Sequence, residues 1–267
     1  MGQVLHRSIA NNPPAWLDFA HRVQSRVIFR EALIHGAGQY NTLAMQEALK
    51  TMSRSVAEIL IKKGKALQEA VRTAAYKIIS YYPSHMQRER TVGRADKDSI
   101  GRASYANDIM SWIALVVLRQ WLAQAQIGDE TYASADLGKK FVDYIVEGGE
   151  KYLNKPELEP FHAYFPMSAK GKAVLESHLA NMKEHIKRFV QDFTANESQL
   201  DPSGYPVKYF LCTIIHPTSD YPWDFGYSST GNANEDDEDE AMGNADTDED
   251  EGDEAISRDA NDSEVSA

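Results

Sequence analysis

The chain has almost no cysteine. Cys212 is the only one among 267 residues, so no disulfide can form within the chain. A chain without disulfides fits a reducing compartment, and we expect an intracellular protein, cytoplasmic or nuclear. The N-terminal stretch MGQVLHRSIANNPPAW also lacks the apolar core of a secretory signal, which argues against secretion.

The motifs that identify cofactor or catalytic chemistry are missing as well. The chain contains no GxGxxG turn, Walker loop, GxSxG elbow, HExxH pair or EF-hand loop. His178 and His185 are seven residues apart, whereas metal-binding histidines on a helix are usually four apart, and no third ligand stands out. We therefore expect no catalytic residue, no cofactor, no metal, and a protein that is not an enzyme.

A membrane-spanning run is lacking too. Residues 109–118 are apolar except for Ser111, but this run is shorter than the roughly 20 residues that cross a bilayer. Apolar residues fall on all sides of a helical wheel in this part of the chain. The sequence therefore predicts a helix over residues 103–126 that is buried nearly all round, as the central element of a helical domain.

Apolar residues recur at helical spacing along much of the rest of the chain. Helices are predicted over residues 16–23, 26–36, 43–82, 135–146 and 169–195. The third contains a capping-box pattern from Ser55 to Glu58, where a helix can restart, and Gly64 weakens it by about 1 kcal/mol relative to alanine. Residues 200–226, rich in proline and aromatics, are predicted to pack along the helices as an extended arm. The expected fold class is mainly α, an irregular multi-helix bundle around the buried helix.

The acidic charge is confined to one end of the chain. Residues 233–267 hold 16 acidic residues and one arginine, whereas the remainder holds 27 basic and 24 acidic residues, a net charge of +3. A dense like charge with few large apolar residues cannot offset the entropy lost on folding. We therefore expect a flexible N-terminus over residues 1–12, a helical domain over 13–226 and a disordered acidic tail over 227–267.

A polar, basic connection precedes the predicted central helix. It is the best candidate binding site, for phosphate, an acidic peptide or the tail itself, and its basic residues are Arg88, Arg90, Arg94, Lys97 and Arg102. The simpler interpretation is a solvated loop with weak local ion pairs. The low net charge outside the tail argues against nucleic acid. Candidate phosphorylation sites are Thr91, Ser104 and Thr247.

Three stretches together resemble a known family. They are PPAWLDFAHRVQSRVIFREALIHGAGQYNT, SYYPSHMQRERTVGRADKDSIGRASYANDIMSWIALVVLRQWL, and the C-terminal pieces PFHAYFPMSAKGKAVLE, NESQLD and DYPW. Over residues 16–223 they resemble the helical region that follows the BTB/POZ domain in a group of fungal proteins. No BTB module precedes residue 16, so the resemblance implies either a truncated chain or a stand-alone copy of that region.

These observations lead to three functional hypotheses. The first is a non-enzymatic protein–protein interaction module, an adaptor-like region of a BTB-type protein, whose partners are other proteins and not membranes. The second is a regulator or chaperone of basic nuclear proteins that acts through the acidic tail. The third is an enzyme of unrecognised type that uses histidines and arginines near the basic connection.

Overall fold

The structure, a computed structural model, describes residues 2–86, 105–127 and 133–224. Within them the chain is mainly helical and contains no strand, which confirms the predicted fold class. The α-helices are α1 (Gly2–Asn11), α2 (Pro13–Arg22), α3 (Arg26–Gly38), α4 (Leu43–Leu49), α5 (Arg54–Ile79), α7 (Tyr105–Ile127), α8 (Lys139–Glu147), α9 (Lys155–Tyr164) and α10 (Ala169–Lys187). The short 3-10 helices are η1 (Ser84–Met86), η3 (Gly149–Lys151) and η4 (Gln191–Thr194). Among these described helices, none has the length and hydropathy to cross a bilayer.

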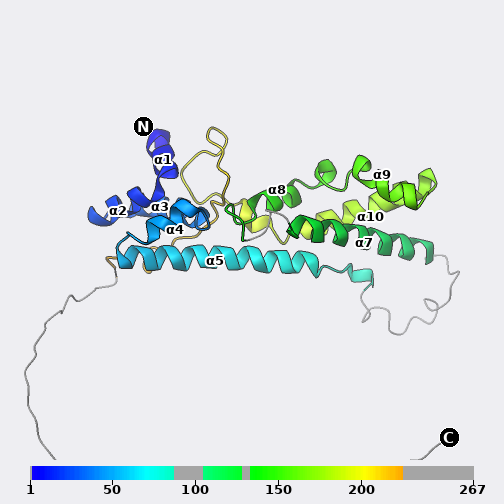
Figure 1. Cartoon of the computed structure of the whole chain (residues 1–267), viewed down its shortest axis with the longest axis horizontal. Coiled ribbons are helices and arrows are strands. Elements are labelled where there is room, and N and C mark those ends of the chain that lie inside the picture. Colours follow the sequence, from blue (N-terminus) through cyan, green and yellow to red (C-terminus); the bar gives the residue numbers. More distant parts are fainter. Residues whose placement is uncertain (1, 87–104, 128–132, 225–267) are drawn as a thin grey trace, which may run out of the picture. The chain divides into compact units, whose positions relative to one another are not determined.

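Helix α5 contributes residues to both hydrophobic cores of the described chain. Figure 1 shows it as the long helix that runs alongside the N-terminal helices and on toward α7. Its first half places Val56 and Leu60 in a core with α1–α4, and its second half places Val71 and Ile78 in a core with α7–α10. With 26 residues it is about 39 Å long, enough to serve both. The organising strut of the described fold is therefore α5, and α7 belongs to one of its two cores.

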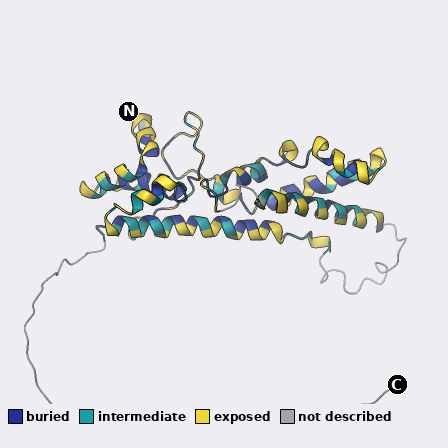
Figure 2. Ribbon diagram, viewed as in Figure 1, coloured by how far each residue is buried: buried dark blue, intermediate teal, exposed yellow. Residues whose placement is uncertain are grey.

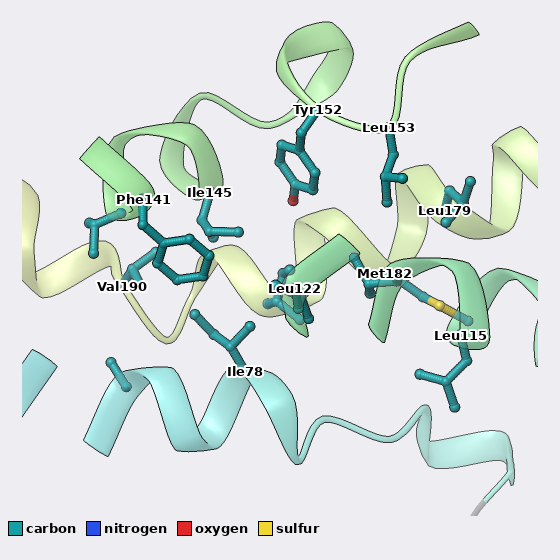
Figure 3. Packing of buried hydrophobic residues seen from close by; sticks show 14 of the residues in the cluster. Ile78, Leu115, Leu122, Phe141, Ile145, Tyr152, Leu153, Leu179, Met182 and Val190 are labelled. Atoms are coloured by element: carbon teal, nitrogen blue, oxygen red, sulfur yellow. The ribbon is translucent and has the colours of Figure 1, made fainter. Parts of the chain in front are cut away.

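The second core is built from the inner faces of α5, α7, α8 and α10. Figure 3 shows Ile78 of α5 pointing toward Leu122 of α7, with Phe141 and Ile145 of α8 above them. All four side chains are buried. Burying a side chain of this size contributes about 1.5–3 kcal/mol, so contacts of this kind hold the four helices together.

The N-terminus differs from the flexible segment we expected. Residues 2–11 form α1, and its Ile9 is fully buried in the first core. The apolar spacing did not predict α1, because this helix has only ten residues and no capping signal at its start. Helix α9 was also missed, because its two prolines suggested a break: one lies in the first turn, where no amide is needed, and Pro160 lies in the middle.

The segment predicted as one long helix is two helices. Helix α4 ends at Leu49 and α5 begins after Ser53, so the restart lies just before the proposed capping box, and Glu58 pairs with Arg54 instead. Gly64 has a role that the helix propensity did not reveal. A Cβ atom there would lie 2.2 Å from Cγ of Tyr40, so only glycine lets the Tyr40 ring pack against α5.

The sequence predicted that α7 is buried nearly all round, and this prediction is wrong. One side packs on α10 and another on α5, which bury Ala114, Leu115 and Leu118. On the remaining side Trp112 and Val116 are exposed. Figure 2 shows exposed stretches along α7. Apolar residues occur all around α7, but neighbouring helices cover only two of its sides. Its third side is apolar and exposed, and we call it the open face of α7.

The predicted C-terminal arm is confirmed as extended chain without a strand. It runs past α3 so closely that a Cβ atom on Gly38 would lie 2.3 Å from the carbonyl oxygen of Phe210. Phe210 belongs to the second core and its neighbour Leu211 to the first. A nearly buried ion pair, Lys63 Nζ to Asp220 Oδ2 at 2.6 Å, fixes its end to α5. The arm thus fastens the two cores to each other.

Candidate functional site

A groove of about 540 Å³ lies between α7 and α9. Its size falls in the range of about 300–1,000 Å³ that is usual for ligand-binding clefts. Its lining residues are mostly aromatic or aliphatic: Val117, Gln120, Trp121, Gln124, Leu153, Glu157, Leu158, Pro160, Phe161, Tyr164 and Phe165. Among these residues Glu157 carries the only charge. The groove can therefore bind an apolar segment and offers amide and carboxylate groups to orient it.

Stacked aromatic rings form the floor of the groove. Trp121 of α7 lies over Tyr152, with the ring centroids 4.3 Å apart and the planes 24° apart. Tyr152 is buried in the second core, and burial raises the pKa of its phenol. A ring packed between a buried tyrosine and the rest of the core keeps one orientation, so the floor is rigid before any partner binds.

The connection from α8 to α9 sets the position of the groove wall. Lys183 of α10 donates from Nζ to the carbonyl oxygens of Gly149 at 2.7 Å and Tyr152 at 2.6 Å, within this connection. Leu153 has a φ of 48°, which is unusual for a residue with a side chain. Its amide donates to Glu157 Oε2 at 2.6 Å. These bonds hold a strained turn and so fix the start of α9.

Helix α9 presents two aromatic side chains at its end. Asn154 is the N-cap that precedes the helix, and its side chain accepts the amide of Glu157 at 3.0 Å. The helix ends at Tyr164, because Pro166 follows and disfavours helical geometry in Phe165. Tyr164 is 84% exposed and Phe165 61% exposed. Large apolar rings exposed at the edge of a groove are typical of a protein-binding surface.

The open face of α7 continues the groove. Ile109, Trp112 and Val116 are exposed at three- and four-residue spacing, and the next positions in this pattern line the groove. From Ile109 to Gln124 the distance along the helix is about 23 Å. A partner segment thus has an apolar track that begins outside the groove and leads into it.

A buried polar cluster in the first core is the second candidate for a functional site. Glu31, His35 and Ser198 meet there: Ser198 Oγ donates to Glu31 Oε1 and lies 3.2 Å from His35 Nε2. The set resembles a nucleophile, base and acid, but His35 Nε2 also faces Glu31, at 3.3 Å. In a catalytic triad the acid binds the other ring nitrogen, which here faces Tyr209. The cluster is therefore structural and fastens the arm to α3.

Hydrogen bonds to the ionised form control the charge of Glu31. Burial by itself raises the pKa of this carboxyl group, but bonds from His35, Ser198 and the Gln199 amide outweigh burial and lower the pKa to about 2. His6 also lies 3.3 Å from the same oxygen. Glu31 therefore stays ionised within a buried network, which is the usual state of a paired interior carboxylate.

The residues predicted as a site lie elsewhere in the chain. Those of the basic connection and the three candidate phosphorylation sites, Thr91, Ser104 and Thr247, are outside the described residues, as is the acidic tail. His178 Nε2 is 3.1 Å from Asn107 Oδ1, and His185 Nδ1 is 2.6 Å from its helix carbonyl at Asn181. Over the described ranges, no cluster of three or more metal-ligating side chains occurs.

The sequence held one signal of the groove that we did not use. Phe161, Tyr164 and Phe165 form an aromatic cluster beside Pro166, and two of the three are exposed. The other side of the groove comes from α7, about 40 residues earlier in the chain. Only the tertiary packing of α7 against α10 brings the two parts together.

Comparison with known proteins gives one match. Residues 83–192 match the model of a fungal FF domain, a family of protein-interaction domains. The matched segment includes α7, α8, α9 and α10, and so contains the whole groove. No curated protein and no solved structure matches the chain. Nothing in these comparisons supports the BTB-type assignment that the sequence suggested.

Proposed function

We propose that the chain is a non-enzymatic protein-interaction module that binds a segment of another protein in the groove between α7 and α9. The observation that carries the proposal is the exposure of Tyr164 and Phe165 beside a preformed apolar groove within the segment that matches an interaction family. Burying two or three such rings supplies several kcal/mol, and a micromolar complex needs about 8 kcal/mol in total.

The geometry supports binding better than catalysis. The groove lining contains one carboxylate, two amides and one phenol but no histidine, cysteine, serine or lysine, so the Ser–His and Cys–His pairs of nucleophilic catalysis are missing from it. The rigid floor and the two exposed rings match the aromatic anchors that carry most of the free energy in protein interfaces.

Site-specific photo-crosslinking tests this proposal. Benzoylphenylalanine is placed at Tyr164 in the full chain, and the protein is irradiated in extract of its source cells. Tyr76 is the matched control, because it is also a tyrosine, is 59% exposed and lies on α5 away from the groove. We expect protein adducts at position 164 that are missing at position 76. The same adduct pattern at both positions, or none at 164, removes the proposal.

The finer form of the proposal is an adaptor, as the resemblance to the region after BTB domains suggests. An adaptor holds two partners at once, so the groove partner and a second protein should elute together with the chain in size-exclusion chromatography. Co-elution of the groove partner alone leaves a simple binding module and rejects the adaptor.

A second candidate function rests on the acidic tail. The 16 acidic residues and one arginine from position 233 onward form a strongly anionic segment that attracts basic proteins. In this proposal residues 227–267 act as a charged tail that regulates or chaperones basic nuclear proteins. Deleting residues 233–267 should abolish binding of a histone-like basic peptide at low salt. Unchanged binding by the shortened chain rejects this function.

Both proposals leave the basic connection as a further candidate for binding anions. Glutamine in place of the five basic residues should weaken binding of an acidic peptide if the connection is a site. If binding is unchanged, the connection is only a solvated loop.

A further inference from the structure

The lining of the groove narrows the kind of segment that it accepts. One wall consists of the aromatic rings of Phe161, Tyr164 and Phe165 together with Pro160, and Trp121 forms the floor. Flat rigid rings suit the flat pyrrolidine rings of proline, and aromatic-lined grooves are how proteins recognise the polyproline II conformation. This conformation is preformed in the free peptide, so little entropy is lost when it binds.

The polar groups of the groove point to an occupant with free backbone carbonyls. Gln120 and Gln124 line it from successive turns of α7, and both are exposed. Four residues along a helix correspond to about 6 Å. A polyproline II segment has no internal hydrogen bonds, so its backbone carbonyls are free to accept from these two amides. A helical occupant already satisfies its carbonyls internally and gains nothing from these amides.

The charge of the groove adds a further condition. Glu157 carries the only charge among the lining residues, and its oxygens accept the amide of Leu153 and the side chain of Asn154. A carboxylate has about four acceptor positions, so it can still receive a cationic side chain. The partner segment should therefore carry a lysine or arginine near the prolines, and an acidic segment should be repelled.

We propose that the occupant of the groove is a proline-rich segment in the polyproline II conformation with one basic residue; this inference rests on the proposed interaction function. Addition of the segment as a β-strand is a poorer fit, because the part of the chain that the structure describes has no sheet edge to extend.

The test is fluorescence anisotropy with the full chain and labelled peptides. The probe is a decaproline peptide in which one central residue is arginine. The comparison peptides replace the arginine by glutamate, or all prolines by alanine. We expect the proline–arginine peptide to bind at least about tenfold more tightly than either comparison peptide. Equal binding of the alanine peptide, or no binding of the probe at about millimolar concentration, overturns the inference.

Variants of the chain test whether the probe peptide binds in the groove. Tyr164→Ala should weaken the probe about tenfold, Gln120→Ala with Gln124→Ala severalfold, and Tyr76→Ala not at all. These side chains are exposed, so circular dichroism should show an unchanged fold. Equal affinity of Tyr164→Ala and the parent chain also overturns the inference. If the crosslinks at position 164 persist while the probe fails, the occupant is of another class and the interaction function stands.

Discussion

Lys183 holds the main chain of Tyr152 in place: its Nζ donates to the Tyr152 carbonyl oxygen at 2.6 Å and lies 4.8 Å from the centre of the Tyr152 ring. Lys183 comes from α10, whereas Tyr152 precedes α9 and forms the underside of the groove floor. A single buried cation thus couples α10 to the connection that sets the wall of the groove.

Replacing Lys183 should destabilise the fold. In Lys183→Met the carbonyl oxygens of Gly149 and Tyr152 lose a charged donor, and Tyr152 stays buried. Hydrogen bonds to charged groups contribute about 1.5–3 kcal/mol, and burial of the ammonium offsets part of this, so we expect a loss of about 2–3 kcal/mol in the free energy of unfolding. Urea titration measures it. Lys155→Met, an exposed control on α9, should change it by less than about 0.5 kcal/mol.

Glu31 should give the fold a dependence on pH in the acid range. The pKa of its carboxyl group is about 2 in the folded chain and near 4.5 when unfolded, so it is depressed by folding. Its contribution is therefore complete above about pH 5 and is lost as the pH falls toward 2. The shift corresponds to about 3 kcal/mol. Urea midpoints measured from pH 6 to pH 2 should fall less steeply in Glu31→Gln, and parallel curves would contradict this.

Gly64→Ala should destabilise the chain although alanine is the better helix former. The added methyl group would lie 2.2 Å from Cγ of Tyr40, which is buried, so the ring or α5 has to shift. Overpacking costs about 1–3 kcal/mol and the gain in helix propensity is about 1 kcal/mol, so we expect a lower melting temperature. Gly171→Ala is the control on α10, where the methyl group meets its nearest atom at 3.4 Å. An unchanged or higher melting temperature for Gly64→Ala shows that the Tyr40 ring can move.

Cys212 should be almost inert in the folded chain. Burial disfavours the thiolate and raises the pKa of this thiol to about 11. At pH 8 only about 0.1% is then ionised, and the thiolate is the form that reacts. We expect iodoacetamide to alkylate native Cys212 about a hundredfold more slowly than the same residue in urea. Similar rates in both conditions would show that the arm detaches readily from α5.

Helical periodicity predicted most of the elements but not their exposure. The spacing of apolar residues located α2, α3, α5, α7 and α10, because an amphipathic helix leaves this pattern whatever it packs against. It overestimated the burial of α7, since an apolar face is the same in sequence whether a neighbour covers it or it lies open. The exposed Trp112 and Val116 are visible only once α10 and α5 are placed.

The effect of proline and glycine on helix boundaries was harder to predict than the helices themselves. Pro160 lies inside α9, and three positions in the preceding connection, Gly148, Gly149 and Leu153, have positive φ angles. The Gly148-Gly149 pair marks a break in the sequence, but no local pattern indicates the positive φ of Leu153, because part of what holds the turn is Lys183, about 30 residues later. The short α1 was missed for a similar reason: its stability comes from Ile9 packing into the first core.

By itself the sequence determined the helical class, the single thiol, the separation of the acidic charge and the absence of familiar catalytic motifs, because these depend on composition and on spacing along the chain. Tertiary structure decided which helix is shared by two cores, which side of α7 stays open, and that the rings of Phe161, Tyr164 and Phe165 face Trp121 across a groove. The physical reason is that burial and proximity are properties of pairs of elements. A residue's neighbours in space are set by how helices distant in sequence pack, and no local pattern records that packing.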